Sequence, residues 1–291
     1  MQKGVKFRIY PNKEQQTIIN QTLGCCRLIY NKGLAMRNEA YQNGNKIGYS
    51  QTSAMLTDLK KSDDFAFLKA VDSIALQQSL RDLDRGFVNF FQKRASHPTF
   101  KSKQNHHQSY RTINQGDNIR IVGKYIKLPK SGFVKIRQTL GVEKINNVTI
   151  ERTPTNKYFA VLNVKFEPQP MSNKGGKIGI DVGIKEFYSD SNGKVVYNPK
   201  YLEKSMRKLI REQRKLSRKE KGSTNRNKQR VKVALVHEKI TNQRNDFLQK
   251  QSTMLIRENQ TICIEDLKVK NMMRNHKLAQ HIGSASWSKF F

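Results

Sequence analysis

The sequence predicts an α+β chain of several domains, in which a small β-barrel interrupted by helices precedes a mixed α/β sheet with long basic helices. Three observations predict this fold class. Apolar and polar residues alternate over residues 119–166, which is the period of half-buried strands. Apolar residues recur at helical spacing over residues 73–91. Aliphatic residues alternate with glycines around a single aspartate over residues 177–183, and the 291 residues suffice for two or three domains.

The charge of the chain indicates its partner. The sequence has 55 Lys and Arg against 23 Asp and Glu, a formal net charge of +32. A compact protein holds such a charge most easily beside a polyanion, so nucleic acid is the expected partner. No apolar run approaches the ~20 residues of a membrane span, and the first residues lack the apolar segment of a secretory signal. We expect a cytoplasmic, nucleoid-associated protein with no membrane partner, and the oligomeric state stays open.

The N-terminal residues are expected to add one strand to the barrel and then leave it. Residues 2–10 alternate between apolar and polar side chains, and Pro11 ends this strand before a first helix. A second helix is expected over residues 26–41. Because residues 2–10 have no neighbouring strand in the sequence, we expect them to pair within the barrel, so that residues 11–106 form a helical insertion.

The clearest helix is predicted over residues 73–91. Its apolar residues recur every three or four positions from Leu76 to Phe91, and this stripe is assigned to the hydrophobic core. The opposite face is polar and basic, which fits either a solvated surface or a contact with nucleic acid. The residues of that face are Gln77, Arg81, Arg85 and Lys93.

Residues 97–111 interleave basic groups with aromatic and amide side chains. Such a mixture suits neutralisation of phosphates together with stacking on bases. The candidate contacts in this segment are Lys101, Lys103, Tyr110 and Arg111.

Neither the cysteines nor the histidines form a metal-binding pattern. Cys25, Cys26 and Cys263 contain no C-x-x-C pair, so they predict neither a disulfide framework nor a zinc site. The adjacent Cys25 and Cys26 are instead expected to be buried packing groups. His106 and His107 have no cysteine or acidic cluster at ligand spacing, so no zinc is expected.

The strands of the barrel are predicted from the period of two. Residues 119–128 form a hairpin, residues 133–136 add a strand, and residues 148–152 pair with residues 158–166. The polar residues 168–176, which contain proline and glycine, are expected to link the barrel to the second sheet.

Asp181 is the first of two candidate site carboxylates. Its flanking glycines let a phosphate or a metal approach the backbone, and an unpaired carboxylate on a hydrophobic sheet costs several kcal/mol. A hairpin with the turn Asn192-Gly193 follows, and the combination suggests the first edge of a ribonuclease H-like sheet. The alternative is an ordinary turn or helix-capping aspartate.

Glu265 is the second candidate carboxylate. Residues 261–267 repeat the pattern of a short strand with an acid at its end. In a ribonuclease H-like sheet this strand lies beside the first, so Glu265 is expected near Asp181, where Mg²⁺ would relieve their repulsion. The alternative is a capping role, which Asp266 could equally fill.

Long basic helices are predicted over residues 201–220 and 225–258, with a break at Gly222. Their charges would repel one another in isolation, and a phosphate backbone lying along them would remove that repulsion and release counterions. The candidate contacts are Arg207, Arg211, Arg214, Lys215, Arg218, Arg226 and Arg230.

Seven motifs along the chain, in this order, together resemble the TnpB family of insertion-sequence proteins, the prokaryotic relatives of type V CRISPR effectors. The resemblance runs essentially from end to end. Each motif is weak alone, and the ordered set is specific. The motifs are residues 8–15, 72–84, 100–103 with 109–112, 179–181, 215–219, 264–267 and 286–288.

The resemblance implies a wedge β-barrel at residues 1–10 and 107–170, a helical recognition domain at residues 11–106 and a RuvC-like domain at residues 171–291. It implies that a guide RNA pairs with double-stranded target DNA while the protein reads a short flanking motif. It also implies that Asp181 and Glu265 are the first and second catalytic carboxylates. By family position, the flanking motif is expected to meet Tyr49, Ser50, Gln51, Thr52 and Arg111.

One departure from the family changes the expectation. Family members normally continue past the Trp287 region with a zinc ribbon and a third catalytic aspartate, whereas this sequence ends at Phe291. Asp181 and Glu265 are therefore expected to be vestigial and to bind Mg²⁺ weakly at most, because two carboxylates balance poorly against two Mg²⁺ ions.

The first hypothesis is an RNA-guided DNA-binding protein that occupies its target without cleavage and represses transcription there. A second hypothesis makes the chain a fragment of an active RNA-guided endonuclease, or one half of it that another chain completes. A third is a DDE-type transposase or Holliday-junction resolvase that acts without RNA, and a fourth is a basic RNA-packaging protein.

Overall fold

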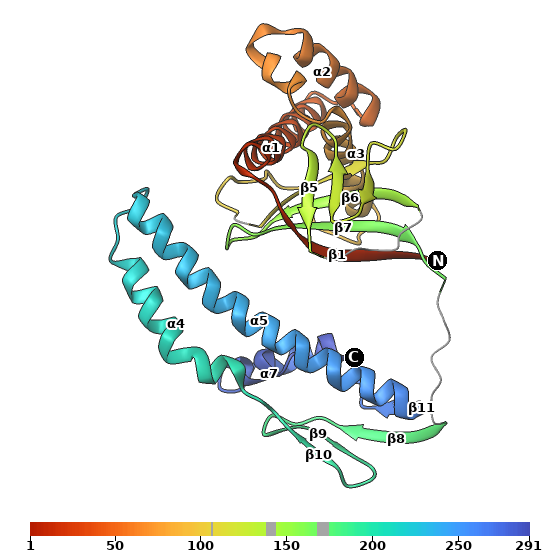
Figure 1. Ribbon diagram of the computed structural model, residues 1–291, viewed down its shortest axis with the longest axis vertical. Coiled ribbons are helices and arrows are strands. Elements are labelled where there is room, and N and C mark those ends of the chain that lie inside the picture. The colour runs from red at the N-terminus through yellow and green to blue at the C-terminus, as the bar shows by residue number, and fades with distance from the viewer. Residues whose placement is uncertain (106, 138–143, 168–174) are drawn as a thin grey trace. The chain divides into compact units, whose positions relative to one another are not determined.

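The computed structural model describes residues 1–105, 107–137, 144–167 and 175–291. The chain divides into two units, residues 1–168 and residues 169–291 (Figure 1). The linker predicted at residues 168–176 and the histidine His106 lie largely or wholly outside the described residues.

The first unit contains a seven-stranded sheet in the order β2-β6-β7-β1-β5-β4-β3, in which all neighbours are antiparallel. β1 lies inside this sheet between β7 and β5, which confirms that the N-terminal strand joins strands far along the sequence. That the sheet is a wedge barrel stays a prediction. The strands are β1 (Gln2–Tyr10), β2 (Gln108–Ile113), β3 (Arg120–Val122), β4 (Tyr125–Leu128), β5 (Gly132–Ile136), β6 (Ile145–Arg152) and β7 (Tyr158–Lys165).

The helices of the first unit differ from the prediction at one point. The two helices expected before residue 42 are one continuous helix of 30 residues, α1 (Lys13–Gln42). Asn12 starts it with a capping box, in which the Gln15 amide donates to Asn12 Oδ1 at 2.8 Å. Gly24 does not end the helix, because a single glycine costs only about 1 kcal/mol there. The others are α2 (Tyr49–Lys61), the 3₁₀ helix η1 (Asp63–Lys69) and α3 (Ser73–Phe91).

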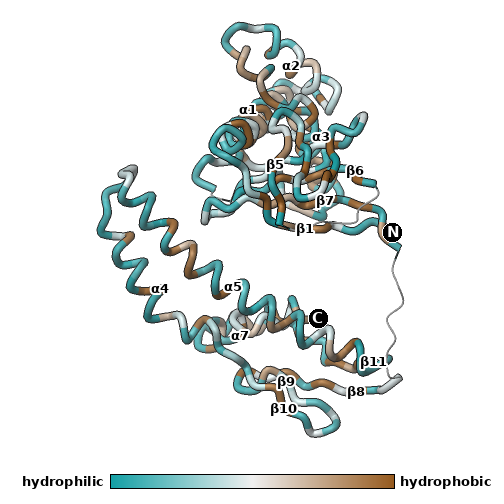
Figure 2. The backbone as a smooth tube through the Cα atoms, viewed as in Figure 1, coloured by the Kyte–Doolittle hydropathy of each residue, from teal (hydrophilic) through white to brown (hydrophobic). Residues whose placement is uncertain are grey.

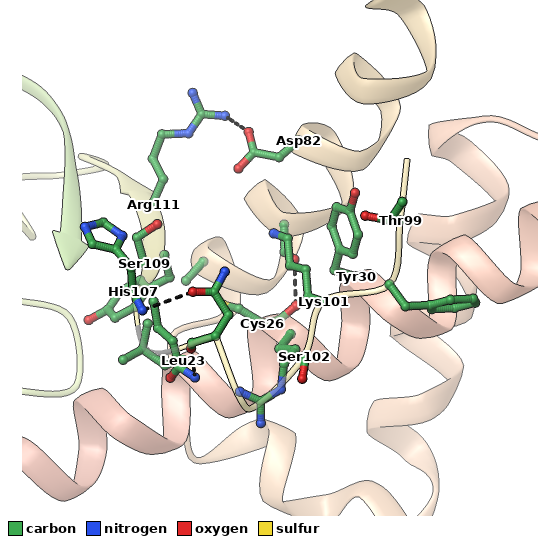
Figure 3. Close-up of a pocket in the computed structure, with 17 residues that line it drawn as sticks. Leu23, Cys26, Tyr30, Asp82, Thr99, Lys101, Ser102, His107, Ser109 and Arg111 are labelled. Carbon is green, nitrogen blue, oxygen red and sulfur yellow. Dashed lines mark hydrogen bonds and ion pairs between the residues drawn. The ribbon is translucent and has the colours of Figure 1, made fainter. Parts of the chain in front are cut away.

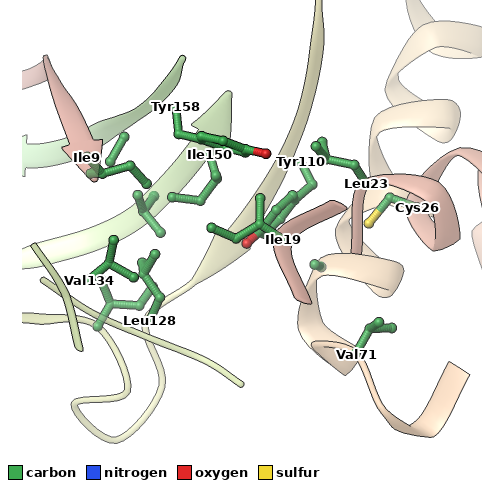
Figure 4. Close-up of a cluster of buried hydrophobic side chains, with 14 of the residues drawn as sticks. Ile9, Ile19, Leu23, Cys26, Val71, Tyr110, Leu128, Val134, Ile150 and Tyr158 are labelled. Atoms are coloured by element: carbon green, nitrogen blue, oxygen red, sulfur yellow. The ribbon is translucent and has the colours of Figure 1, made fainter. Parts of the chain in front are cut away.

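One hydrophobic core joins these helices to the sheet. Ile19, Leu23 and Cys26 of α1 belong to the same buried cluster as Ile9 and Ile150 of the strands (Figure 4). Cys25 and Cys26 are both buried, as predicted. The further division of this unit into a barrel and a helical recognition domain stays a prediction.

α1 and α3 approach closely at Gly33. A Cβ atom at this position would lie 2.8 Å from Leu80 Cδ2 and 3.1 Å from Leu83 Cδ2. Both leucines are fully buried, so only glycine leaves room for this contact. The core stripe predicted on α3 is right as far as Phe87, but Phe91 is 71% exposed.

The second unit contains a four-stranded mixed sheet in the order β10-β9-β8-β11. β8 and β9 are antiparallel, whereas β11 returns after two long helices to lie parallel to β8. Together with the first unit, this makes the chain a mixed α/β protein. The strands are β8 (Gly176–Asp181), β9 (Glu186–Asp190), β10 (Val195–Tyr197) and β11 (Asn259–Ile264).

The predicted basic helices form an antiparallel hairpin. α4 (Tyr201–Ser217) and α5 (Thr224–Glu258) pack through Leu209, Val233, Val236 and Ile240. The remainder of the hairpin is largely hydrophilic (Figure 2). The short helices α6 (Val269–Met272), α7 (Ala279–Ala285) and α8 (Trp287–Phe290) follow β11, and Trp287 is buried with the strand residues of this unit.

Across the described ranges, none of the helices is both long enough and apolar enough to cross a membrane.

Candidate nucleic-acid interface and carboxylate pair

A half-open cleft of about 430 Å³ lies in the first unit, between α1, α3 and the segment at residues 99–111 (Figure 3). Two hydrogen bonds hold Lys101 at this cleft, since Asn31 Nδ2 donates to the Lys101 carbonyl and the Lys101 amide donates to Asn31 Oδ1. Lys101 Nζ lies 4.0 Å from the centroid of the Tyr30 ring, a cation–π contact. Desolvation lowers the pKa of Lys101, an effect that Asp82 opposes. The structure thus places the predicted Lys101 in a preformed cleft.

Arg111 reaches the same cleft and is already paired. Its Nη2 donates to Asp82 Oδ1, and its side chain is 26% exposed. The ion pair ties β2 to α3 and cancels part of the positive charge of the cleft. Arg111 therefore has a structural role that the sequence did not indicate.

Two predicted contact residues are buried, so their side chains cannot meet nucleic acid directly. Tyr110 is 6% exposed within the core, and burial raises the pKa of its hydroxyl. Its ring cannot stack on a base, which corrects the prediction. Thr52 is 1% exposed, and its hydroxyl bonds to the carbonyls of Gly48 and Tyr49 at 3.2 and 3.0 Å. Tyr110 faces inward because buried and less buried positions alternate along β2, and Thr52 lies with Leu56 on the buried face of α2.

A second group of predicted contacts lies where α2 meets α3. The Arg81 guanidinium carbon lies 4.5 Å from the centroid of the Tyr49 ring, so the two helices share a cation–π contact. Gln51 Oε1 accepts the Gly48 amide at 3.0 Å and caps α2. The remaining predicted residues of this region are exposed: Ser50, Gln77, Arg85 and, on the 99–111 segment, Lys103.

The predicted cations of α4 are exposed. Arg211 and Lys215 flank the buried Glu212 at 3.4 and 3.7 Å. The pKa of Glu212 is lowered, first by the hydrogen bond from Gln229 at 2.7 Å and then by these cations. The exposed members are Arg207, Arg211, Arg214, Lys215 and, at the C-cap, Arg218.

Two predicted cations of α5 are only half exposed. Arg226 Nη1 donates to the carbonyls of Leu216 and Lys219 at 2.8 Å each, and so closes the turn between α4 and α5. Arg230 is half-buried on the same helix. Arg226 is therefore a structural residue first, because both bonds satisfy carbonyls at the end of α4.

The parallel pairing of β8 and β11 brings the two candidate carboxylates together. Ile180 lies opposite Ile264, so Asp181 and Glu265 are the next residues at the same edge of the sheet. Both are exposed. This confirms that the two strands lie beside each other in parallel, while the pairing of the two acids at one site and their catalytic role stay predictions.

The chemistry of this pair fits one Mg²⁺ ion. Magnesium is commonly held by one or two carboxylates together with substrate phosphates, and Asp181 and Glu265 supply two. Among the described residues, no group of three or more His, Cys, Asp or Glu is arranged to hold a metal.

Several residues of the cleft were not predicted from the sequence. Arg27, Tyr30 and Asp82 line it together with Lys101. They lie on helices whose contacts with the 99–111 segment span up to 70 residues, so no local pattern could have found them.

Two family models match the chain. A model described as a probable transposase matches residues 151–276. A model described as a helix-turn-helix domain matches residues 1–46, where the structure has β1 and the single helix α1.

Three relatives are similar over different shares of the chain. A putative RNA-guided DNA endonuclease of Streptomyces pristinaespiralis is 39% identical over 99% of this chain and 73% of its own length. The putative RNA-guided DNA endonuclease InsQ of Escherichia coli is 35% identical over 93% of this chain and 67% of its own length. The virulence protein VsdF of Salmonella dublin is 36% identical over 35% of this chain and 95% of its own length.

Among solved structures, a Cas12f1–sgRNA–target DNA complex covers 99% of this chain and 87% of its own, at 12% identity and a TM-score of 0.48. A CRISPR-Cas12f ternary complex covers 89% of this chain and 64% of its own, at 14% identity and a TM-score of 0.35. The identities and coverage of the two putative endonucleases define the class as transposon-encoded nuclease-like proteins. Within that class, the chain belongs to the TnpB family.

Proposed function

We propose that the chain binds a guide RNA and, through it, a double-stranded target DNA beside a short flanking motif. The observation that carries this proposal is the 39% identity, over 99% of the chain, to a putative RNA-guided DNA endonuclease. The net charge of +32 is consistent with two nucleic-acid partners.

The roles of the parts follow from the family and from the exposed charges. Residues 1–10 and 107–170 would act as the wedge, residues 11–106 as the recognition domain and residues 171–291 as a RuvC-like domain. The exposed cations of α4, with Lys101 and Lys103 of the first unit, would neutralise phosphates of the guide RNA. Such contacts give affinity without sequence specificity, which base pairing supplies.

The finer proposal is that the chain as given occupies its target without cutting it and thereby represses transcription in the cytoplasm, at the nucleoid. In this proposal Asp181 and Glu265, which follow the paired residues Ile180 and Ile264, are two neighbouring acids with two negative charges. Two Mg²⁺ ions carry four positive charges, so this pair would hold one ion weakly and would support in-line cleavage poorly. One Mg²⁺ bound there would supply Lewis-acid polarisation of a phosphate.

A second candidate function is cleavage of the guided target. The names of both long relatives favour it, since each is a putative RNA-guided DNA endonuclease. Asp181 and Glu265 would then be catalytic in the presence of further groups.

Reading of the flanking motif is testable at the contact between α2 and α3. We expect Arg81→Ala to weaken binding of a guide-matched duplex most strongly when the native flanking bases are present, because Arg81 and Tyr49 form one preorganised polar and aromatic surface. Loss of a base contact costs about 1–3 kcal/mol and relaxes preference at that position. The measurement is binding of the RNA complex to a duplex library with randomised flanking bases.

The matched control is Arg85→Ala, one helical turn along the same exposed face of α3. Arg85→Ala should weaken binding by a similar factor for all flanking sequences and keep the preferred motif. An unchanged motif in Arg81→Ala, or a library without any preferred flank in the unmodified protein, would contradict the assignment.

A further inference from the structure

An aromatic cluster at the C-terminal end of α3 has no role in the function proposed above. Phe87 is 8% exposed and packs in the core with Leu34 and Leu83. Phe91, one turn later, is 71% exposed. A single exposed ring is common on protein surfaces, so a role for Phe91 depends on the cluster around it and on the charges of that cluster.

The exposed ring rests on other rings. The Phe91 centroid lies 6.2 Å from that of Phe87 with an interplanar angle of 29°, and 5.4 Å from that of Phe90. His97 meets Phe87 and Phe90 edge-on at 5.3 and 5.2 Å. Phe87 and Phe90 thus support Phe91 from the protein side, and His97 packs against those two rings, which limits the entropy that Phe91 would lose on binding.

The backbone after α3 is shaped to complete this cluster. Lys93 has φ +57°, in the left-handed region that glycine favours. The Lys93 and Arg94 amides donate to the carbonyls of Phe90 and Asn89 at 2.9 and 2.8 Å, which ends the helix. This reversal brings His97 back against Phe87 and Phe90, although the left-handed conformation is strained for a lysine.

The charges around the cluster are mainly positive. The Arg37 guanidinium carbon lies 4.2 Å from the Phe87 ring centroid, and Lys93 and Arg94 are exposed beside the cluster. The acid nearest in sequence on α3, Asp84, accepts a hydrogen bond from Arg37 Nη1 at 2.9 Å. Arg37 is therefore paired, and the surface combines the exposed Phe91 ring with the exposed cations Lys93 and Arg94.

We propose that Phe91 is a stacking platform for an unpaired nucleobase of a bound nucleic acid. Every base has a π-face, and aromatic rings flanked by cations are the usual means of holding single strands without sequence preference. A second copy of this chain is a poor occupant, because it would bring another +32 of net charge against this basic surface. The proposal rests on nucleic-acid binding but not on guided targeting.

The unpaired base can come from two sources, an RNA single strand or a DNA single strand. Binding of the full-length protein to fluorescently labelled single-stranded RNA, single-stranded DNA and blunt duplex DNA of equal length separates them. We expect Phe91→Ala to weaken binding of a single strand about fivefold to a hundredfold, the range for loss of one stacked base. We expect the slope of log K against log salt to stay unchanged, because no phosphate contact is lost.

Two further variants distinguish stacking from simple apolar contact. Phe91→Tyr keeps the ring face and should bind as the unmodified protein does. Phe91→Leu keeps an apolar side chain without a ring face and should bind as weakly as Phe91→Ala. The fluorescence of 2-aminopurine in the strand should be quenched by the unmodified protein and less by Phe91→Leu.

The matched control is Phe67→Ala, since Phe67 is 49% exposed but follows the acidic residues Asp63 and Asp64 in η1. It should leave binding unchanged. Equal single-strand binding by the unmodified protein and Phe91→Leu would overturn the proposal. The proposal would also be overturned if the Phe91 substitutions changed only the oligomeric state, measured by sedimentation, because Phe91 would then belong to an interface between copies of the chain. Failure of guided targeting alone would leave the single-strand result intact, so the two proposals can fail separately.

Discussion

Replacing Arg207, Arg211, Arg214 and Lys215 of α4 with Gln is expected to remove most of the RNA that the protein retains at moderate salt. The four side chains are exposed along one helix of the hairpin. If each meets one phosphate, the slope of log K against log salt should become shallower by about 3 units, at roughly 0.7 per single-strand contact. The measurement is RNA binding between 50 and 200 mM salt, where six to ten phosphate contacts cost about 10³–10⁵ in affinity.

The control for this variant removes the same charge elsewhere. Lys13, Lys46, Lys69 and Lys124 are exposed on the first unit, outside the predicted contacts. Substitution of these four lysines with Gln should change the slope of log K against log salt little. In the α4 variant the helix should stay folded, because Gln is a good helix former. Equal losses of RNA binding in the two variants would mean that binding depends only on the net charge of the protein. The assignment of the RNA contacts to α4 would then be wrong.

Gly33→Leu is expected to destabilise the first unit by about 3 kcal/mol. The Cβ alone would lie 2.8 Å from Leu80 Cδ2, inside a contact between α1 and α3 that has no free space. Overpacking a core costs about 1–3 kcal/mol and occasionally more, and the remaining atoms of the leucine side chain add to this cost. The measurement is the free energy of unfolding of the first unit, obtained from a denaturant titration.

The control is Gly24→Leu on the same helix. Its Cβ would meet only Arg27 Nη2, at 4.0 Å. Because leucine is the better helix former by nearly 1 kcal/mol, this variant should be as stable as the unmodified protein or slightly more stable. Similar stabilities for the two variants would show that α1 and α3 separate easily, which contradicts the packing described here.

Long-range strand pairing could be predicted where the sequence carried a clear period and a chemical reason for proximity. The strand before Pro11 was expected in the first sheet because it lacked a local partner, and β1 lies there. The two acidic strand ends were expected side by side, and β8 pairs with β11 in parallel. In both cases the alternation of apolar and polar residues predicted the strand, and the usual topology of β-sheets predicted which strand lies beside it.

Details that depend on tertiary packing were not predictable. A helical stripe shows which residues share a face, but it does not show how far along the helix another element covers that face. Phe91 was therefore assigned to the core and is exposed. Tyr110 was assigned to the surface by its basic neighbours, but its place in β2 points it into the core. The ion pair of Arg111 with Asp82 joins residues 29 apart and left no local signal.

Substitution of Asp181 or Glu265 tests the proposal that the chain binds its target DNA without cleaving it. If the pair is vestigial, replacing either acid should leave guided binding unchanged or tighten it slightly, because each exposed negative charge near phosphate is worth about 1 kcal/mol or less. If the pair is catalytic, either substitution should reduce cleavage by several orders of magnitude.

The measurement that decides between these accounts incubates the purified RNA complex with Mg²⁺ and a double-stranded DNA that matches the guide and carries the flanking motif. A duplex with a scrambled guide match, and the Asp181→Ala and Glu265→Ala proteins, run beside it, with binding and strand cuts read from the same samples. The account predicts binding of the matched duplex alone, equal in all three proteins, with both strands intact. Guide-dependent cuts that vanish in either variant, or equal binding of the scrambled duplex, would contradict it.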